Sequence, residues 1–428
     1  VKATIDQLRP GHFIELEGGW WSHNFIRSKF LIESPRVLDE LRAAGILSVR
    51  VHPDKGTTPF PAPDNVPPPP RHVPPGRAPT PAGEPVVSNT TPTPPDASPS
   101  LQAALKRGTE MRRRQESAEQ AHTKALEETQ FVMKNLLAQG PEVARRTREF
   151  VGDAVATVMA DDATLHLLSS RQGEQSLRFH SLQVMTLGLL VGKRLGLDEA
   201  DMNDLATAAL FHDTGIGRLQ DSVRMAAGGG SRVEQEAYQS HVLYSVELAK
   251  ASGAVSKNAL AAILTHHEAF NGAGYPNKLN GETIPLLGRV LAVVDRYDYM
   301  VNPSGSSLGM TPAEALSRLF QQEAARFDKA VLHAFAKSVG VYPPGSIIRL
   351  SDDRYGIVIG VNTDALMFPS ILVYEPSVLK SQAPVIDLQE TAGVNIASCL
   401  AAQMVPKDVL DYLNPRGRVA YFYSRPGG

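Results

Sequence analysis

Apolar residues recur at helical spacing through five successive stretches between about residues 165 and 300, and each stretch brings a histidine or an aspartate onto or beside its apolar side. The first stretch begins at His180, and the third runs roughly from Glu234 to Ala251. The other three contain i, i+3, i+4, i+7 sets, a spacing that places their polar members on the face that packs into a core. These sets are Leu205, Ala208, Ala209 and His212; Leu260, Ile263, Leu264 and His267; and Leu291, Val294, Asp295 and Asp298.

The pattern changes on both sides of these helices. Residues 101–150 are rich in Ala, Glu, Gln, Lys and Arg, which favour helix, and the segment either connects two domains or forms a dimer. The sequence leaves both interpretations open. Residues 341–428 instead show short apolar runs between turn residues, which predicts a small β-rich module with a short helix. Its strand candidates are 347–350, 356–361, 371–374 and 419–422.

Two further segments precede the helices. Residues 1–55 predict a small, mostly β module, with one short helix within 37–46 and a strand at 48–51. Residues 56–100 predict a disordered spacer with polyproline character, because 16 of the 32 prolines fall between 59 and 99 and few apolar residues accompany them. The expected fold is therefore multidomain and mainly α: an all-α helical bundle, residues 151–340, flanked by small mostly-β N-terminal and C-terminal modules.

Composition narrows the class of protein. Hydrophobic residues at 42% and charged residues at 21% are ordinary for a soluble globular chain. A net charge of −2 gives no reason to expect binding to a nucleic-acid polymer or to a membrane surface, and no stretch approaches the roughly 18 apolar residues of a membrane span. The single cysteine, Cys399, excludes an internal disulfide and a cysteine-based zinc site. We therefore expect a cytoplasmic protein.

The histidines and aspartates on apolar faces indicate a metal site. Burying one such group without a partner costs a few kcal/mol, so seven of them need a strong shared partner, and imidazole and carboxylate are good ligands for divalent transition metals. Neighbouring side chains on a helix diverge by about 100°, so an adjacent pair can serve one site only near a helix end, or else serves two neighbouring metals. The adjacent pairs His212-Asp213 and His266-His267 therefore predict a dinuclear site. By itself, His241 would more often be a core residue, and His166 and His333 are interpreted as structural.

These residues carry a family resemblance. His212-Asp213-Thr214-Gly215 resembles the signature of the HD phosphohydrolase superfamily, and the run 266–276, His-His-Glu-Ala-Phe-Asn-Gly-Ala-Gly-Tyr-Pro, resembles the signature of its HD-GYP branch. The similarity covers about residues 150–345 and continues through Leu279, Gly281, Ile284-Pro285, Arg289 and Asp295-Arg296-Tyr297-Asp298. Residues 1–55, with Leu8-Arg9-Pro10-Gly11 and Trp20-Trp21, resemble the small domain often found ahead of HD-GYP domains.

The resemblance implies hydrolysis of the bacterial second messenger cyclic di-GMP to linear pGpG or GMP. It implies a first metal held by His180, His212, Asp213 and Asp295, and a second held by Asp213, His241, His266 and His267. Asp213 would bridge the two ions, and His212 and Asp213 form the catalytic pair. Iron or manganese is the usual metal in this family, and zinc or nickel also suits these ligands. Two ions would activate a bridging water for in-line attack on phosphorus. Ser176 stands where some relatives have a third-metal Glu.

Several residues are expected to contact the substrate. Gly272 and Gly274 would let the loop backbone approach the ligand, and Tyr275 would either stack on a guanine or pack the loop. Further candidates are Pro276, Arg289, Asp298 and Arg218.

The sequence also departs from the family pattern. Ile216 replaces a usual lysine, and the stretch from Asn302 to Ser307 lacks two usual cations, although phosphate is normally held by Arg or Lys. The alternative is therefore a degenerate relative that keeps its metals but acts as a cyclic di-GMP sensor or as a scaffold for signalling proteins, with weak or no turnover. The sequence leaves open the metal, the product, the signal sensed by residues 1–55 and the oligomeric state.

Overall fold

The structure, a computed structural model, divides the chain into two compact units, Val1–Gln102 and Ala103–Gly428. It describes residues 2–4, 7–16, 29–32, 38, 48–56, 58, 99–135, 141–160, 164–168, 177–225, 230–303, 309–362, 365–391, 393–413 and 419–424. The predicted spacer, Trp20-Trp21 and nearly all of the helix expected within 37–46 lie outside these residues.

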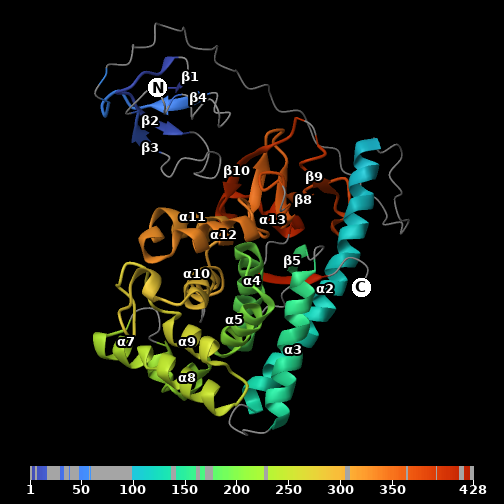
Figure 1. Cartoon of the computed structure of the whole chain (residues 1–428). Helices are drawn as coiled ribbons and strands as arrows, with labels where there is room; N and C mark the ends of the chain where they lie inside the picture. The colour runs from blue at the N-terminus through green and yellow to red at the C-terminus, as the bar shows by residue number, and fades with distance from the viewer. Residues whose placement is uncertain are drawn as a thin grey trace, which may run out of the picture. The chain divides into compact units, whose positions relative to one another are not determined.

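The N-terminal unit contains a four-stranded antiparallel sheet with the order β1-β4-β2-β3 (Figure 1). Its strands are β1 (Lys2–Thr4), β2 (Phe13–Leu16), β3 (Lys29–Leu31) and β4 (Ser48–Val51). Strand β4 is the one predicted at 48–51. Ile14 and Val49 are fully buried, so one face of this sheet forms a small apolar core.

The larger unit is built around a helical bundle, as the sequence predicted. Helix α4 (Leu177–Leu195) is central, because it is apolar on nearly all sides and packs against α5, α10 and α12. The helices of this region are α3 (Pro141–Met159), α5 (Glu199–Phe211), α6 (Asp221–Met225), α7 (Arg232–Gln239), α8 (His241–Ala251), α9 (Lys257–Thr265), α10 (Leu286–Val301), α11 (Pro312–Gln321) and α12 (Lys329–Val339). None of the helices in the described ranges is long and apolar enough to cross a bilayer.

One predicted helix is divided in two. The stretch from Glu234 to Ala251 forms α7 and α8, which meet at Ser240. The Ser240 hydroxyl donates to the carbonyl of Ala237 at 2.6 Å, a local bond that competes with the regular helical ladder. This break makes His241 the first residue of α8.

A seven-stranded sheet completes the larger unit, and most of it comes from the predicted C-terminal module. Its strands are β6 (Ile347–Leu350), β7 (Tyr355–Gly360), β8 (Ser370–Val373), β9 (Val385–Asp387), β10 (Ile396–Leu400), β11 (Ala420–Ser424) and β5 (Thr164–Leu168). The main order is β10-β6-β7-β5-β11, and β8 pairs with β7 and β9. Strand β5 comes from the segment between α3 and α4, so the bundle and the C-terminal segment share one sheet.

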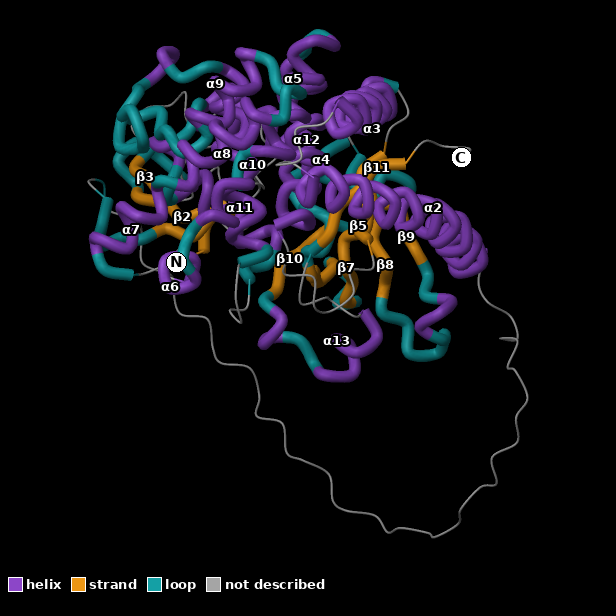
Figure 2. The backbone as a smooth tube through the Cα atoms, turned by 90° about the horizontal axis from the view of Figure 1, so that it is seen from below, coloured by secondary structure: helices purple, strands orange, loops and turns teal. Residues whose placement is uncertain are grey.

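The long helix α2 (Pro99–Asn135) runs beside this sheet (Figure 2). Gln115 of α2 donates to the carbonyl of Leu167 in β5 at 2.9 Å, and Arg112 donates to that of Ala383 at 3.3 Å. The segment 101–150 therefore supplies α2 and the first part of α3, and α2 packs on the same unit as the bundle. Helix α13 (Lys407–Leu413) packs against β7.

Two buried side-chain amides attach the C-terminal strand to the bundle. Gln183 of α4 donates to the carbonyl of Tyr421 at 3.1 Å and accepts from its N–H at 2.7 Å. Asn302, directly after α10, makes the same two bonds with Val419, at 2.8 and 3.0 Å. Each amide thus acts as a neighbouring strand would. Helices α4 and α10 also carry His180 and Asp295, so β11 is connected to the elements that hold predicted ligands.

Candidate metal centre

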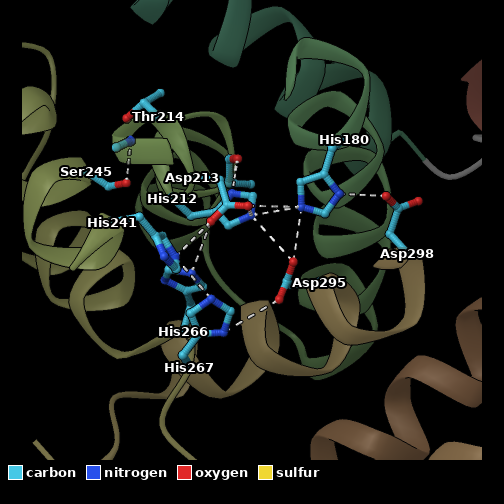
Figure 3. A network of polar contacts seen from close by, with 12 residues as sticks. His180, His212, Asp213, Thr214, His241, Ser245, His266, His267, Asp295 and Asp298 are labelled. Atoms are coloured by element: carbon cyan, nitrogen blue, oxygen red, sulfur yellow. Dashed lines mark hydrogen bonds and ion pairs between the residues drawn. The ribbon is translucent and has the colours of Figure 1, made fainter. Parts of the chain in front are cut away.

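Both adjacent pairs of predicted ligands lie at helix ends. His212 caps the C-terminus of α5 and Asp213 follows it, while His266 caps α9 and is followed by His267. Beyond a helix end the backbone can turn, so both members of each pair point into the same region, as Figure 3 shows. Only such a position near a helix end lets both members of an adjacent pair serve one site.

Three of the histidines have a fixed orientation. In each, Nδ1 lies within hydrogen-bond distance of the backbone carbonyl three residues earlier. Since a carbonyl only accepts, Nδ1 carries the proton and Nε2 keeps its lone pair for the interior of the site. The bonds are His212 to Ala209 at 2.8 Å, His241 to Tyr238 at 2.6 Å, and His266 to Ile263 at 2.6 Å.

The seven predicted ligands form two groups that share Asp213. In one group the donor atoms of His180, His212, Asp213 and Asp295 all lie within 4.8 Å of one another, and the same limit holds for Asp213, His241, His266 and His267. The two carboxylate oxygens of Asp213 face different groups. Oδ2 lies 3.7 Å from Nε2 of both His180 and His212, whereas Oδ1 lies 3.3 Å from Nε2 of His241 and 3.6 Å from that of His266.

The donor atoms are arranged to bind divalent cations rather than to hydrogen-bond to one another. Nε2 of His180 and Nε2 of His212 lie 3.2 Å apart. Because the Nδ1 atoms of both rings are bonded to oxygen acceptors, two lone pairs face each other there when both rings are neutral, the form that binds a metal. Oδ1 of Asp213 and Nε2 of His266 are buried without a hydrogen-bond partner. Such groups are costly unless a partner binds them, and a metal ion would satisfy all of them.

Local electrostatics favours the metal-binding protonation state at four of the predicted ligands. Burial alone would raise the pKa of Asp213, but His212, His241 and His266 outweigh it and hold that pKa well below its usual range. His180 and His212 have the same effect on Asp295. Burial lowers the pKa of both His266 and His267, which keeps these rings neutral. Ionised carboxylate and neutral imidazole are the ligating forms. At His180 and His241 burial lowers the pKa, but hydrogen bonds to carboxylates outweigh it and raise the pKa of both rings.

Asp298 lies behind the first group. Its Oδ2 accepts from Nδ1 of His180 at 2.7 Å, and its Oδ1 accepts from the Asn302 amide at 2.8 Å. The carboxylate is 1% exposed, and both of its oxygens are engaged. Asp298, expected to contact substrate, lies on the cavity wall and is placed to orient His180.

A cavity of about 450 Å³ opens over the two groups. His180, Asp213, His266, His267 and Asp295 reach its wall, and aromatic rings form much of the rest: Phe179, Tyr238, Tyr275, Tyr299 and Phe327. Tyr275 lies against His267, with ring centroids 4.8 Å apart. Flat aromatic surfaces beside a metal cluster suit a ligand that combines planar rings with phosphate.

The glycines of the signature loop serve the loop itself. Gly272 has φ +79°, which favours glycine, and a Cβ on Gly274 would come within 2.2 Å of the backbone nitrogen of Ala269. Neither glycine lines the cavity, nor does Pro276. The close backbone approach that the structure shows at Gly274 is one between two parts of the loop.

Glu268 was not expected to have a role. It is 3% exposed, and its carboxylate accepts from the backbone N–H groups of Asn277 at 2.6 Å and Leu279 at 3.0 Å. It therefore closes the loop that presents Tyr275. A buried glutamate directly after two predicted ligands was the available signal.

The expected arginine contacts are not brought to the cavity. Arg218 pairs with Glu247 at 2.7 Å, and Arg289 pairs with Asp328 at 2.5 Å. Neither arginine lines the cavity, whereas Arg296 and Arg326 do. Ile216 also lies on the cavity wall, so its side chain stands where a lysine could reach the site.

Comparisons with known proteins agree with the sequence resemblance. Residues 138–331 match the HD domain family, and residues 1–146 match a domain of unknown function, DUF3391. The cyclic di-GMP phosphodiesterase PA4108 of Pseudomonas aeruginosa is 27% identical over 392 residues, which span 90% of this chain and 88% of that protein.

Shorter matches involve two other named proteins. The cyclic di-GMP phosphodiesterase response regulator RpfG of Xanthomonas campestris is 33% identical over 150 residues, 35% of this chain and 39% of that protein. The 3'3'-cGAMP-specific phosphodiesterase 2 of Vibrio cholerae is 36% identical over 104 residues, 24% of this chain and 20% of that protein. The solved structure of Bd1817, an HDG"Y"P protein from Bdellovibrio bacteriovorus, covers 78% of this chain and 97% of its own, with 14% identity and a TM-score of 0.43, too loose a likeness to bear on function.

The recognition of an HD domain preceded by a DUF3391 region is thereby confirmed. The mainly α fold with small β sheets at both ends is confirmed as well.

Proposed function

We propose that this chain is a metal-dependent phosphodiesterase that hydrolyses cyclic di-GMP to linear pGpG or to GMP. The observation that carries the proposal is the pair of four-residue groups that share Asp213 at the base of an aromatic cavity. The names of the relatives, one of them similar over nearly the whole chain, support the substrate class.

The two groups define which residues would hold the ions. His180, His212, Asp213 and Asp295 would hold one, and Asp213, His241, His266 and His267 the other. Two divalent ions bound there supply a Lewis acid for the phosphodiester and an activated water. Iron or manganese is our expectation, and zinc or nickel suits the same donors.

The remaining residues of the site position these groups and the substrate. Asp298 orients His180, and Asn302 in turn holds Asp298. Glu268 fixes the loop that places Tyr275 beside His267, where the tyrosine ring can stack on a guanine. Such pre-organisation matters because a misplaced reacting group costs rate even when every ligand is present.

The test is turnover by the full chain reconstituted with iron or manganese. Metal content is measured by elemental analysis, and products from cyclic di-GMP and 3'3'-cGAMP are separated by chromatography. We expect about two ions per chain and release of pGpG or GMP, with an Asp295→Asn variant as the control for contaminating activity. Fully metallated protein that neither binds nor cleaves cyclic di-GMP contradicts the proposal.

A second candidate, a metal-loaded cyclic di-GMP sensor or signalling scaffold, is favoured by one observation. Ile216 presents an apolar side chain to the cavity where the family usually has a lysine. Tight binding of cyclic di-GMP by protein with two ions and no turnover would establish the sensor.

A further inference from the structure

The cavity has only two fixed positive charges among its described lining residues, those of Arg296 and Arg326. Arg296 is already matched: its Nε and a terminal nitrogen lie 2.8 and 2.7 Å from the two carboxylate oxygens of Glu323. A bidentate pair of this kind uses the charge and the direction of the guanidinium. The guanidinium of Arg296 is therefore already engaged by a carboxylate of the protein.

Arg326 differs because it is exposed, and no ion pair joins it to a carboxylate in the part of the chain that the structure describes. It ends the short 3-10 turn Ala324–Arg326, three positions before the first residue of α12. Its guanidinium is thus available to a ligand in the cavity.

The backbone of Arg326 is nevertheless held in place. Its carbonyl accepts from the N–H of Phe270 at 2.7 Å, and its N–H donates to the carbonyl of Glu323 at 2.9 Å. Phe270 belongs to the signature loop, three residues after His267. The backbone of Arg326 is therefore hydrogen-bonded to the loop that carries both His267 and Tyr275. Tyr275 and Arg326 both lie on the cavity wall, so the ring and the guanidinium border the same space.

A cyclic dinucleotide needs such a cation. It carries two phosphodiesters, each with one negative charge, and the two ligand groups can engage only the one being cleaved. The other acidic groups on the wall, Glu268 and Asp298, would repel the second phosphate. Phosphates in protein sites are normally held by Arg or Lys, and a guanidinium can make two parallel bonds to one phosphate.

We propose that Arg326 binds the second, uncleaved phosphate of the cyclic dinucleotide and is thereby a specificity-determining residue of this site. The proposal rests on the proposed function. Arg218 and Arg289, the two arginines expected to contact substrate, are both paired elsewhere.

The test compares Arg326→Gln and Arg326→Lys with a matched control, Lys329→Gln. The control removes one positive charge from an exposed residue three positions later that does not line the cavity. Each metallated protein is assayed with cyclic di-GMP and with bis(p-nitrophenyl) phosphate, which has a single phosphodiester. Dissociation constants for cyclic di-GMP and metal content are measured alongside.

We expect Arg326→Gln to weaken cyclic di-GMP binding and kcat/KM by roughly tenfold, as loss of one charge-assisted contact predicts, while metal content and bis(p-nitrophenyl) phosphate turnover stay unchanged. Arg326→Lys should recover part of the loss, and Lys329→Gln should behave as wild type.

Three results overturn the inference. Equal losses on both substrates would assign Arg326 a structural role, and wild-type behaviour of Arg326→Gln on an active enzyme would remove its phosphate contact. The same loss in Lys329→Gln would indicate only a general charge effect. Failure of the wild type itself to bind or cleave cyclic di-GMP would instead refute the proposed function.

Discussion

Asp213 belongs to both groups of predicted metal ligands. Its two carboxylate oxygens face different pairs of imidazoles, and Oδ1 is buried without a hydrogen-bond partner. A carboxylate in this position contributes to both groups at once. An isolated Asp at a helix end would not have indicated a ligand shared by two ions. The prediction depended on the position of Asp213 directly after His212.

Replacement of this shared residue should affect both ions. We expect Asp213→Ala to reduce metal content from about two ions per chain to well below one, because each group loses one of four ligands and the negative charge that offsets the cations. Elemental analysis after gel filtration measures this. Asp298→Ala is the matched control, since it removes only the partner of His180 and should weaken one ion at most. Retention of two ions by Asp213→Ala would contradict the shared-ligand assignment.

Ile216 allows a second test at the level of one side chain. It lies on the cavity wall, so Ile216→Lys should add a cation near the substrate phosphates and raise cyclic di-GMP turnover by about tenfold or less, with unchanged metal content. The gain should be larger in an Arg326→Gln background, where the other free cation is missing. Steady-state kinetics and elemental analysis decide this, and a variant that only slows the enzyme would show that the cavity already has the charge it needs.

At the scale of elements, helical spacing predicted the site well because its ligands lie within helices or at their ends. The apolar members of the i, i+3, i+4, i+7 sets lie within α5 and α9, whereas His212 caps α5 and His267 lies two residues beyond the end of α9. The break at Ser240 could not be predicted from spacing, since apolar positions continue across it. The positions of Asp298 and Glu268 in the sequence did not distinguish their roles. A carboxylate that orients a metal ligand or closes a loop looks in sequence like one that binds substrate.

The attachment of β11 gives a prediction about elements. Gln183→Ala leaves the buried N–H and carbonyl of Tyr421 in β11 unpaired, and Asn302→Ala does the same to Val419, directly before β11. Each unpaired group costs about 1–3 kcal/mol, so both variants should melt several degrees below wild type. Only Asn302 also holds Asp298, so only Asn302→Ala should weaken metal binding, by about tenfold. Thermal melts and metal titrations measure the two effects. Equal metal affinities in the two variants would show that the attachment of β11 does not affect the metal site.

At the scale of the whole molecule, the sequence separated a bundle from a C-terminal β module, whereas the structure joins them. Strand β5 pairs along its length with β11, the last strand of the described chain. Five residues, Thr164–Leu168, carry too little periodicity to indicate a strand, and pairing between segments so far apart leaves no local signal. The short strands of the C-terminal segment were predictable because turn residues separate them.

The larger unit contains everything that the site uses, and this leads to the last prediction. The residues that line the cavity and orient its ligands lie between Leu177 and Phe327, with Val419 behind them, all within the unit that starts at Ala103. A chain that begins at Pro99 should therefore keep two ions and wild-type kcat/KM. A chain that begins at Pro141 is the contrasting variant: it also loses α2, whose Gln115 and Arg112 bond to Leu167 and Ala383, and should melt well below wild type.

Elemental analysis, turnover and circular dichroism of both shortened chains test this expectation together. If the chain that begins at Pro99 keeps its helices and its two ions but loses turnover, residues 1–98 contribute to the substrate site. The catalytic unit would then extend beyond the bundle and its sheet. If it loses the ions as well, the N-terminal residues support the metal centre itself, and the division at residue 102 has no functional meaning. Wild-type behaviour would leave residues 1–98 free for another role, such as recognition of a signal or of a partner protein.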